Sequence, residues 1–364
     1  MSSKIIIPQH ILGIKKYVPG RQIEDAIAEF GLTRVIKLAS NENNLGPSPK
    51  AVEAMREAFI GLARYGDPDA KALKNAIGEK TNFPSENILC GNGSSELILL
   101  LCQVFLEPGL NAIMSRPSFT LYAKLAAANG AEAREVALKN HAHDLKRLAE
   151  LIDPQTRLIF LDNPLNPTGA FLNAKDIHDF VSSLPETVLL VLDEAYVDFA
   201  REGRPDYAKL IATEQVVILR TFSKLYGLAG IRAGYAILSK YLAEAINKIR
   251  QPFNLNNFAQ VGVLAAFDDQ EHVNKTLAMT QEGLKFLKSE LEVLGLKTYP
   301  TQANFLMADT APLLADYFVQ ELFKKGLIIR SLSSFGMPDK VRITAGLQNE
   351  NALLIEGIKK ILNS

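Results

Sequence analysis

Short, almost uninterrupted apolar runs recur along the first two thirds of the chain, each separated from the next by a longer stretch. The clearest is Val188–Leu192, five consecutive aliphatic residues between Thr187 and Asp193. Such a run predicts a strand buried on both faces, and its alternation with amphipathic helices is typical of crossover units around a mostly parallel sheet. We expect seven strands, at 87–90, 111–114, 133–137, 158–161, 188–192, 216–219 and 234–238.

Helical periodicity fills most of the intervals between these strands. The expected helices lie at 51–62, 70–80, 96–105, 121–129, 174–182 and 241–248. From about Phe258 the pattern changes to one long helix through Leu294, followed by strands near 304–308, 327–329 and 341–343, each beside a helical segment. This predicts an α/β fold with a large domain at 36–265, containing the seven-stranded sheet, and a smaller α+β domain from 1–35 and 266–364.

The composition excludes several classes of function. Forty Lys and Arg residues balance forty Asp and Glu residues, which argues against a surface for duplex nucleic acid. The two cysteines, Cys90 and Cys102, form neither a CxxC pair nor a disulfide framework. No apolar stretch suits a signal peptide or a membrane span. We therefore expect a cytoplasmic protein with no nucleic-acid or membrane partner.

Polar residues follow two of the predicted strands. Lys224 comes just after strand 216–219, where open α/β sheets bind ligands, and could act as a Schiff-base nucleophile if its pKa were lowered. Asp193 and Tyr196 follow strand 188–192, and this carboxylate could hold a cationic ring nitrogen. The alternatives are a surface lysine and an aspartate that only caps a helix.

Two glycine-containing turns follow two other strands. In Gly91–Glu96, the start of a helix and the hydroxyls of Ser94 and Ser95 predict an anion site. The spacing matches neither a Walker loop nor the dinucleotide fingerprint, so one phosphate fits better than a pyrophosphate; a plain turn and helix cap is the alternative. In the rigid loop 162–169, Asn166 is the candidate ligand contact.

The order of these motifs resembles the pyridoxal-phosphate aminotransferases of fold type I, and within them the histidinol-phosphate aminotransferases. The resemblance covers nearly the whole chain. It rests on Asn41-Glu42-Asn43, Arg64–Pro68, Asp193–Tyr196, Thr221–Arg232 and Val341–Thr344. One departure is Asn44-Leu45-Gly46, where the family commonly has proline, an aromatic residue and glycine after Asn43.

The resemblance implies a role for each site residue. Lys224 would be the catalytic residue, linked to pyridoxal 5'-phosphate and moving a proton to and from the substrate. Asp193 would pair with the ring nitrogen, Tyr196 and Asn166 would hold the phenolic oxygen, and Phe119 would stack on the ring. The phosphate would be held by Gly93, Ser94, Ser95, Ser223, Arg232 and, from the other subunit of a homodimer, Tyr65.

The resemblance also implies the substrates, histidinol phosphate and 2-oxoglutarate, in a step of histidine biosynthesis that yields imidazole acetol phosphate and L-glutamate. Arg342 would bind the glutamate carboxylate, and Arg330 and Tyr17 would bind the substrate phosphate. Asn43 is a further residue expected to bind substrate. An intramolecular ion pair is the alternative for either arginine.

Three other functions remain as alternatives. The nearest is an aromatic amino-acid aminotransferase acting on phenylalanine or tyrosine, and the next a pyridoxal-phosphate decarboxylase of a phosphorylated amino acid. An effector domain of a transcription regulator is disfavoured, because the first motif begins within about forty residues and leaves no room for a helix-turn-helix module. His141 and His143 could be metal ligands, but no third ligand lies at useful spacing, so we expect no metal.

Overall fold

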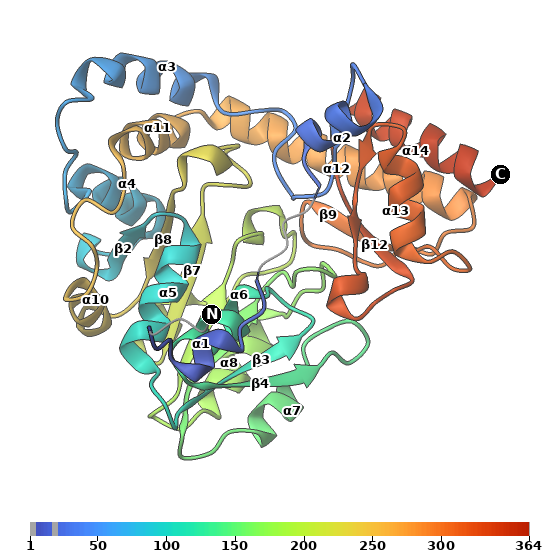
Figure 1. Cartoon of the computed structure of the whole chain (residues 1–364). Coiled ribbons are helices and arrows are strands. Elements are labelled where there is room, and N and C mark those ends of the chain that lie inside the picture. Colours follow the sequence, from blue (N-terminus) through green and yellow to red (C-terminus); the bar gives the residue numbers. More distant parts are fainter. Residues whose placement is uncertain (1–4, 17–20, 364) are drawn as a thin grey trace.

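The computed structural model describes residues 5–16 and 21–363, and its largest element is a seven-stranded sheet (Figure 1). Its order is β2-β8-β7-β6-β5-β3-β4, and all neighbouring strands are parallel except where β8 pairs antiparallel with β2 and β7. All seven predicted strands are confirmed. They are β2 (Ile88–Gly91), β3 (Asn111–Arg116), β4 (Glu132–Ala137), β5 (Thr156–Asp162), β6 (Leu189–Asp193), β7 (Val216–Thr221) and β8 (Gly234–Ile237).

Helices cover both faces of this sheet. One face packs its apolar side chains against α5 (Ser94–Phe105), α6 (Leu121–Ala128) and α10 (Lys240–Asn247). The other packs against α3 (Pro49–Ala58), α4 (Lys71–Thr81), α7 (Leu145–Glu150), α8 (Ala174–Ser182), α9 (Tyr207–Ala212) and α11 (Asn257–Phe267). The six predicted helices of this region are confirmed, while α9, six residues long, was not predicted.

The prediction of one long helix at 258–294 is wrong, because the chain forms two helices there, α11 and α12 (Gln270–Val293). Asp269 caps α12: its carboxylate accepts hydrogen bonds from the His272 amide (3.3 Å) and the Ser48 hydroxyl (2.6 Å). A carboxylate that accepts a hydrogen bond from the first turn of a helix favours the start of α12 at this point over the continuation of α11. The break lets α12 run from the large sheet toward the C-terminal unit (Figure 1).

The C-terminal unit contains a three-stranded antiparallel sheet, in the order β11-β12-β9. β9 (Phe305–Asp309) and β12 (Lys340–Thr344) confirm two predicted strands, whereas β11 (Arg330–Ser331) was not predicted. β10 (Leu327–Ile328), which was predicted, pairs in parallel with β1 (Ile36–Lys37). Helices α13 (Ala315–Phe323), α14 (Gln348–Leu362) and the end of α12 pack around these strands. The division at residues 36 and 265 stays a prediction.

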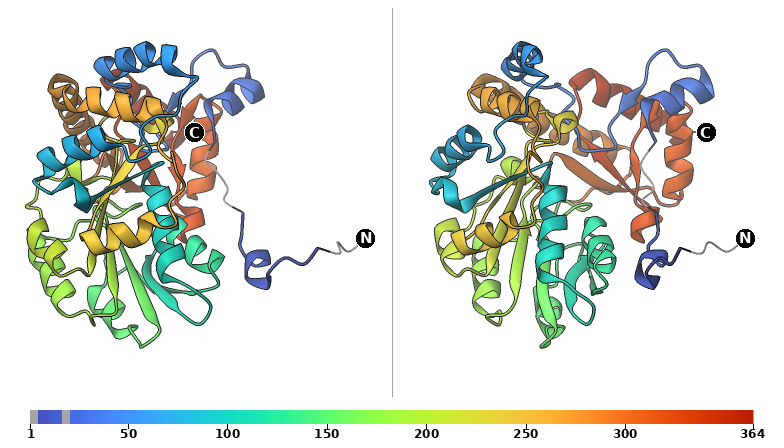
Figure 2. Two further views of the ribbon diagram at one scale, coloured as in Figure 1. Left: turned by 90° about the vertical axis from the view of Figure 1, so that its left-hand side faces the viewer. Right: turned by 60° about the vertical axis from the view of Figure 1, so that its left-hand side comes forward.

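The N-terminal segment lies outside these layers. Helix α1 (Gln9–Leu12) contacts α6, but the segment around it extends away from the body of the molecule (Figure 2). Its side chains Ile5, Ile6 and Leu12 are exposed. Farther along, α2 (Ile23–Phe30) packs on the C-terminal unit through Ala26 and Phe30. Among the described residues, no helix has the length and apolar character that crossing a bilayer requires.

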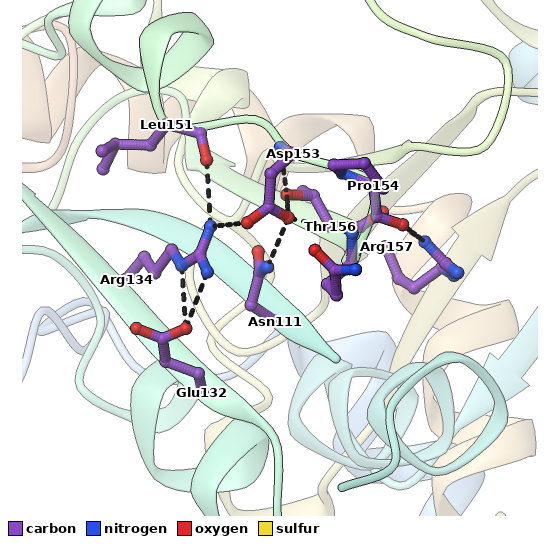
Figure 3. A network of polar contacts seen from close by, with 9 residues as sticks. Asn111, Glu132, Arg134, Leu151, Asp153, Pro154, Thr156 and Arg157 are labelled. Carbon is purple, nitrogen blue, oxygen red and sulfur yellow. Dashed lines mark hydrogen bonds and ion pairs between the residues drawn. The ribbon is translucent and has the colours of Figure 1, made fainter. Parts of the chain in front are cut away.

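A polar network joins three strands at the edge where β3 and β5 begin (Figure 3). Arg134 of β4 donates to Glu132 (2.9 Å), to Asp153 (2.5 Å) and to the Leu151 carbonyl (3.2 Å). Asn111 donates to the same Asp153 carboxylate at 2.9 Å. The hydrogen bond from Arg134, the largest influence, lowers the pKa of Asp153 to about 2. The outermost strand, β4, is thus tied to the loop that precedes β5.

Replacing Arg134 with methionine is expected to lower the midpoint of thermal unfolding at pH 7 by about 2 °C. Because the pKa of Asp153 is lowered in the folded state, its contribution is present above about pH 4 and is lost as the pH falls through about 2. Arg157→Met is the matched control, because Arg157 donates only to the nearby carbonyls of Pro154 and Thr156. Calorimetry giving equal midpoints for the two variants would contradict the assignment.

Candidate active site

Polar side chains gather at the edge of the sheet where β5, β6 and β7 end. Asp162 and Asp193 are register partners on β5 and β6, and Lys224 follows β7. The Lys224 ammonium group donates to the Ser40 carbonyl at 3.3 Å and lies 5.5 Å from the centre of the Tyr196 ring. Parallel strands end at one edge of a sheet, so the predicted site residues Asp193, Tyr196 and Lys224 come together there.

Asp193 is buried, with 4% of its surface exposed. One carboxylate oxygen accepts from the Tyr122 hydroxyl (2.8 Å) and the other from the Ala195 amide (3.1 Å). Burial raises the pKa of Asp193 to about 6, although these hydrogen bonds oppose the rise. A cation placed against this carboxylate would favour its ionised form.

Tyr122 was not predicted as a site residue. Its ring stacks on Phe160 with centroids 4.6 Å apart and meets the edge of Phe119 at 5.5 Å. The only sequence signal is its nearness to Phe119, which lies two residues before α6 begins, while Tyr122 lies in the first turn of that helix.

Gly93 and the start of α5 form a cradle beneath the Arg232 guanidinium. Gly93 has a φ of +75°, and a Cβ atom there would lie 2.6 Å from the nearest nitrogen of Arg232. Arg232 donates to the Ala229 carbonyl (3.0 Å) and the Ser223 hydroxyl (3.5 Å), so no carboxylate neutralises it in the part of the chain that the structure describes. With Ser94 and Ser95 opening α5, the arrangement suits one anion.

Arg342 connects the C-terminal unit to the loop after β5. Its guanidinium donates to the Asn166 side-chain oxygen at 2.5 Å and to the Ala39 carbonyl at 2.6 Å. The backbone N–H of Asn166 donates to the Asp162 carboxylate at 2.8 Å. Arg330 is the register partner of Arg342 across β11 and β12, and its guanidinium lies 5.8 Å from the centre of the Phe335 ring. Like charges on directly opposite residues repel, so this pair favours an anionic ligand.

Three further predicted residues remain to be placed. The Asn43 side chain donates to the Leu225 carbonyl and the Thr276 hydroxyl, both at 3.0 Å, and accepts from the Leu45 amide. Tyr65 is 83% exposed and stacks on Phe253, with centroids 4.5 Å apart. Tyr17 lies outside the described residues.

The two histidines before α7 have structural partners. His143 is buried between the Ser115 hydroxyl (2.6 Å) and the Asp162 carbonyl (3.0 Å), and burial lowers its pKa to about 4. His141 meets the edge of Tyr299 at 4.6 Å. Within residues 5–16 and 21–363, no group of three or more His, Cys, Asp or Glu side chains could hold a metal ion.

Comparison with known proteins agrees with this geometry. The family model described as "Aminotransferase class I and II" matches residues 33–358. A histidinol-phosphate aminotransferase 2 of Carboxydothermus hydrogenoformans is 44% identical, covering 96% of this chain and 97% of the relative. A histidinol-phosphate aminotransferase of Desulfotalea psychrophila is 41% identical, covering 99% and 96%.

A solved structure of histidinol-phosphate aminotransferase from Sinorhizobium meliloti, in complex with pyridoxal-5'-phosphate, superposes with a TM-score of 0.91. The two sequences are 27% identical, and the match covers 100% of this chain and 99% of that one.

Replacing His143 with glutamine is expected to flatten the dependence of stability on pH. The folded-state pKa of His143 lies below its ordinary value of 6.5, so its contribution is present above pH 6.5 and is lost as the pH falls toward 4. By linkage, the wild type should lose up to about 3 kcal/mol more unfolding free energy than the variant over that interval. Urea unfolding at pH 7.0, 5.5 and 4.5 measures this, and parallel curves for the two proteins would refute it.

Proposed function

The chain belongs to the class I and II aminotransferases, and we propose that it transfers the amino group of histidinol phosphate to 2-oxoglutarate with pyridoxal 5'-phosphate as cofactor. The products are imidazole acetol phosphate and L-glutamate, a step of histidine biosynthesis. The main support for this proposal is the 44% identity to a histidinol-phosphate aminotransferase over 96% of this chain. The lysine, buried carboxylate and anion cradle described above suit the same chemistry.

The residues present fit pyridoxal 5'-phosphate. Gly93, Ser94, Ser95, Ser223 and Arg232 offer one anion cradle, which suits a single phosphate group. Asp193 is a buried acid whose ionised form a protonated ring nitrogen would favour. The aromatic ring of Phe119 packs edge-on with Tyr122, the residue that donates to Asp193, and so lies near that carboxylate. When bound, the cofactor supplies an electron sink that stabilises negative charge on the substrate carbon.

The chain's own residues then divide the remaining tasks. Asp193 holds the ring nitrogen in its protonated form. The Lys224 amine removes a proton from the substrate carbon and returns it. Tyr196 and Asn166 hydrogen-bond the phenolic oxygen, and Phe119 keeps water from one face of the ring.

Two arginines explain how one site accepts two different substrates. Histidinol phosphate carries a phosphate but no carboxylate, whereas glutamate carries two carboxylates. Arg342, already oriented by Asn166 and the Ala39 carbonyl, binds a glutamate carboxylate, and Arg330 with Tyr17 binds the substrate phosphate. Asn43 contributes by fixing the turn at Leu45, whose amide donates to its side-chain oxygen, and by donating to the carbonyl of Leu225, the residue after Lys224.

We also propose a homodimer located in the cytoplasm. Phe59, Ile60 and Leu62 are exposed next to Tyr65, and Ile60 is 95% exposed. An apolar surface of this kind is typical of a subunit interface. Tyr65 then reaches the phosphate cradle of the partner subunit. Two free, buried cysteines are compatible with a reducing compartment.

A single half-reaction tests the substrate. Protein loaded with pyridoxal 5'-phosphate is mixed separately with histidinol phosphate and with phenylalanine, and the loss of the cofactor's visible absorbance band is followed. We expect fast loss with histidinol phosphate alone, and Arg330→Gln should slow that reaction by about 10- to 100-fold. Equal or faster reaction with phenylalanine would instead indicate an aromatic aminotransferase.

Two further measurements complete this test. Lys224→Ala should lack the visible band and show no turnover. Transfer also requires that 2-oxoglutarate become glutamate; release of carbon dioxide without glutamate would indicate a decarboxylase.

Hybrid dimers test the placement of Tyr65. Lys224→Ala and Tyr65→Ala, each low in activity, are co-expressed and purified together. If Tyr65 acts across the interface, a hybrid dimer has one intact site, and random pairing should restore about a quarter of wild-type activity. Co-expression of Lys224→Ala with the Lys224→Ala/Tyr65→Ala double variant is the matched control, because no dimer then has an intact site. Activity no higher than in the separate parents would refute the placement.

A further inference from the structure

The Tyr196 hydroxyl has a buried neighbour, Asn41, to which the sequence motifs assigned no role. The side-chain nitrogen of Asn41 lies 2.9 Å from the Tyr196 hydroxyl oxygen, and both residues are buried. We propose that Asn41 is a positioning residue that directs the hydroxyl proton of Tyr196 toward the phenolic oxygen of the cofactor. This inference rests on the proposed function, because it concerns how Tyr196 acts on pyridoxal 5'-phosphate.

Thr344 fixes the orientation of the Asn41 amide. The backbone N–H of Asn41 donates to the Thr344 hydroxyl oxygen at 3.0 Å. The hydroxyl proton of Thr344 is therefore left to donate to the side-chain oxygen of Asn41, which lies 3.1 Å away. With its oxygen facing Thr344, the amide must present its NH₂ group to Tyr196. In the opposite orientation the NH₂ group would donate to the Thr344 hydroxyl oxygen, and the hydroxyl proton of Thr344 would lose its acceptor in Asn41.

An NH₂ group is a donor only, so Asn41 cannot accept the Tyr196 proton. Two neighbours of the Tyr196 ring offer that proton no acceptor. The Lys224 ammonium over the ring is also a donor, and the Phe305 ring beside it is apolar. Among the described residues, the one hydrogen bond of the Tyr196 hydroxyl is the one it accepts from Asn41, and no group there accepts its proton. The hydroxyl therefore has its proton available for an acceptor that enters the site.

The backbone holds Asn41 rigidly in this place. Its φ of +53° lies in the left-handed region, which asparagine tolerates better than most residues. Asn304 donates to the Asn41 carbonyl at 3.2 Å, in addition to the two bonds with Thr344. The preceding carbonyls, of Ala39 and Ser40, accept from Arg342 and Lys224. Segment 39–41 thus contacts three site residues, each through a different group.

A pH titration of the cofactor's visible absorbance band measures the proposed role. A hydrogen bond donated to the phenolic oxygen stabilises that oxygen in its unprotonated form and so lowers the titration midpoint. Tyr196→Phe removes the donor and should raise the midpoint by about one pH unit. Asn41→Gly keeps the left-handed backbone but removes the amide, so the Tyr196 proton is no longer directed, and the midpoint should rise by about half as much.

The double variant Asn41→Gly/Tyr196→Phe separates this role from a merely structural one. If Asn41 acts through Tyr196, the double variant should titrate like Tyr196→Phe alone. Thr276→Val is the matched control: it removes a buried hydroxyl that holds the same loop through Asn43, without contact to Tyr196, and should leave the midpoint unchanged. Thr344→Val removes the hydroxyl that orients the Asn41 amide, and it serves as a second variant if Asn41→Gly does not fold. We expect Thr344→Val to raise the midpoint as well.

The outcomes distinguish this inference from the function on which it rests. A wild-type protein that binds no pyridoxal 5'-phosphate on Lys224 would overturn the proposed function. If the wild type binds the cofactor and Tyr196→Phe titrates as the wild type does, the inference is wrong. An unchanged midpoint in both Asn41→Gly and Thr344→Val, or additive shifts in the double variant, would overturn it as well.

Discussion

The buried carboxylate of Asp193 is costly to ionise, and hydrogen bonds from Tyr122 and the Ala195 amide offset only part of that cost. Its register partner, Asp162, is also buried, and burial together with the proximity of Asp193 raises the pKa of Asp162 well above its usual range. The sheet therefore brings two acids together where neither is well solvated. A cationic ring nitrogen against Asp193, as proposed above, would stabilise that arrangement by favouring the ionised carboxylate.

The C-terminal unit takes part in the site through segment 39–41. The same short stretch accepts hydrogen bonds from Arg342 and Lys224 and donates one to Tyr196. Arg342 also reaches Asn166, on the loop after β5. A substrate anion at Arg342 would thereby be linked directly to Asn166, and through segment 39–41 to Lys224 and Tyr196.

The sequence predicted the large sheet well because strands buried on both faces appear as continuous apolar runs. Site residues such as Lys224 and Asp193 were predicted because each directly follows such a strand. Strands β1 and β11 were missed because each has two residues and no apolar run, whereas β10, equally short, lies in one. The break at Asp269 was missed because a cap interrupts the helix without changing its apolar pattern. Tyr122 and Asn41 were missed because their partners lie 71 and 155 residues away.

The arginines at the two edges of the large sheet differ in how their charge is balanced. Where β3 and β5 begin, Arg134 is balanced by Glu132 and Asp153 within the chain, whereas at the opposite edge Arg232 is left for an incoming anion. Selection acts on these edges in different ways. Any neighbouring substitution that restores local charge balance can compensate for a change at Arg134, so the first edge is free to drift between lineages. At the second edge the compensating group would be a small molecule, which cannot mutate, and variation there is limited to what that molecule tolerates.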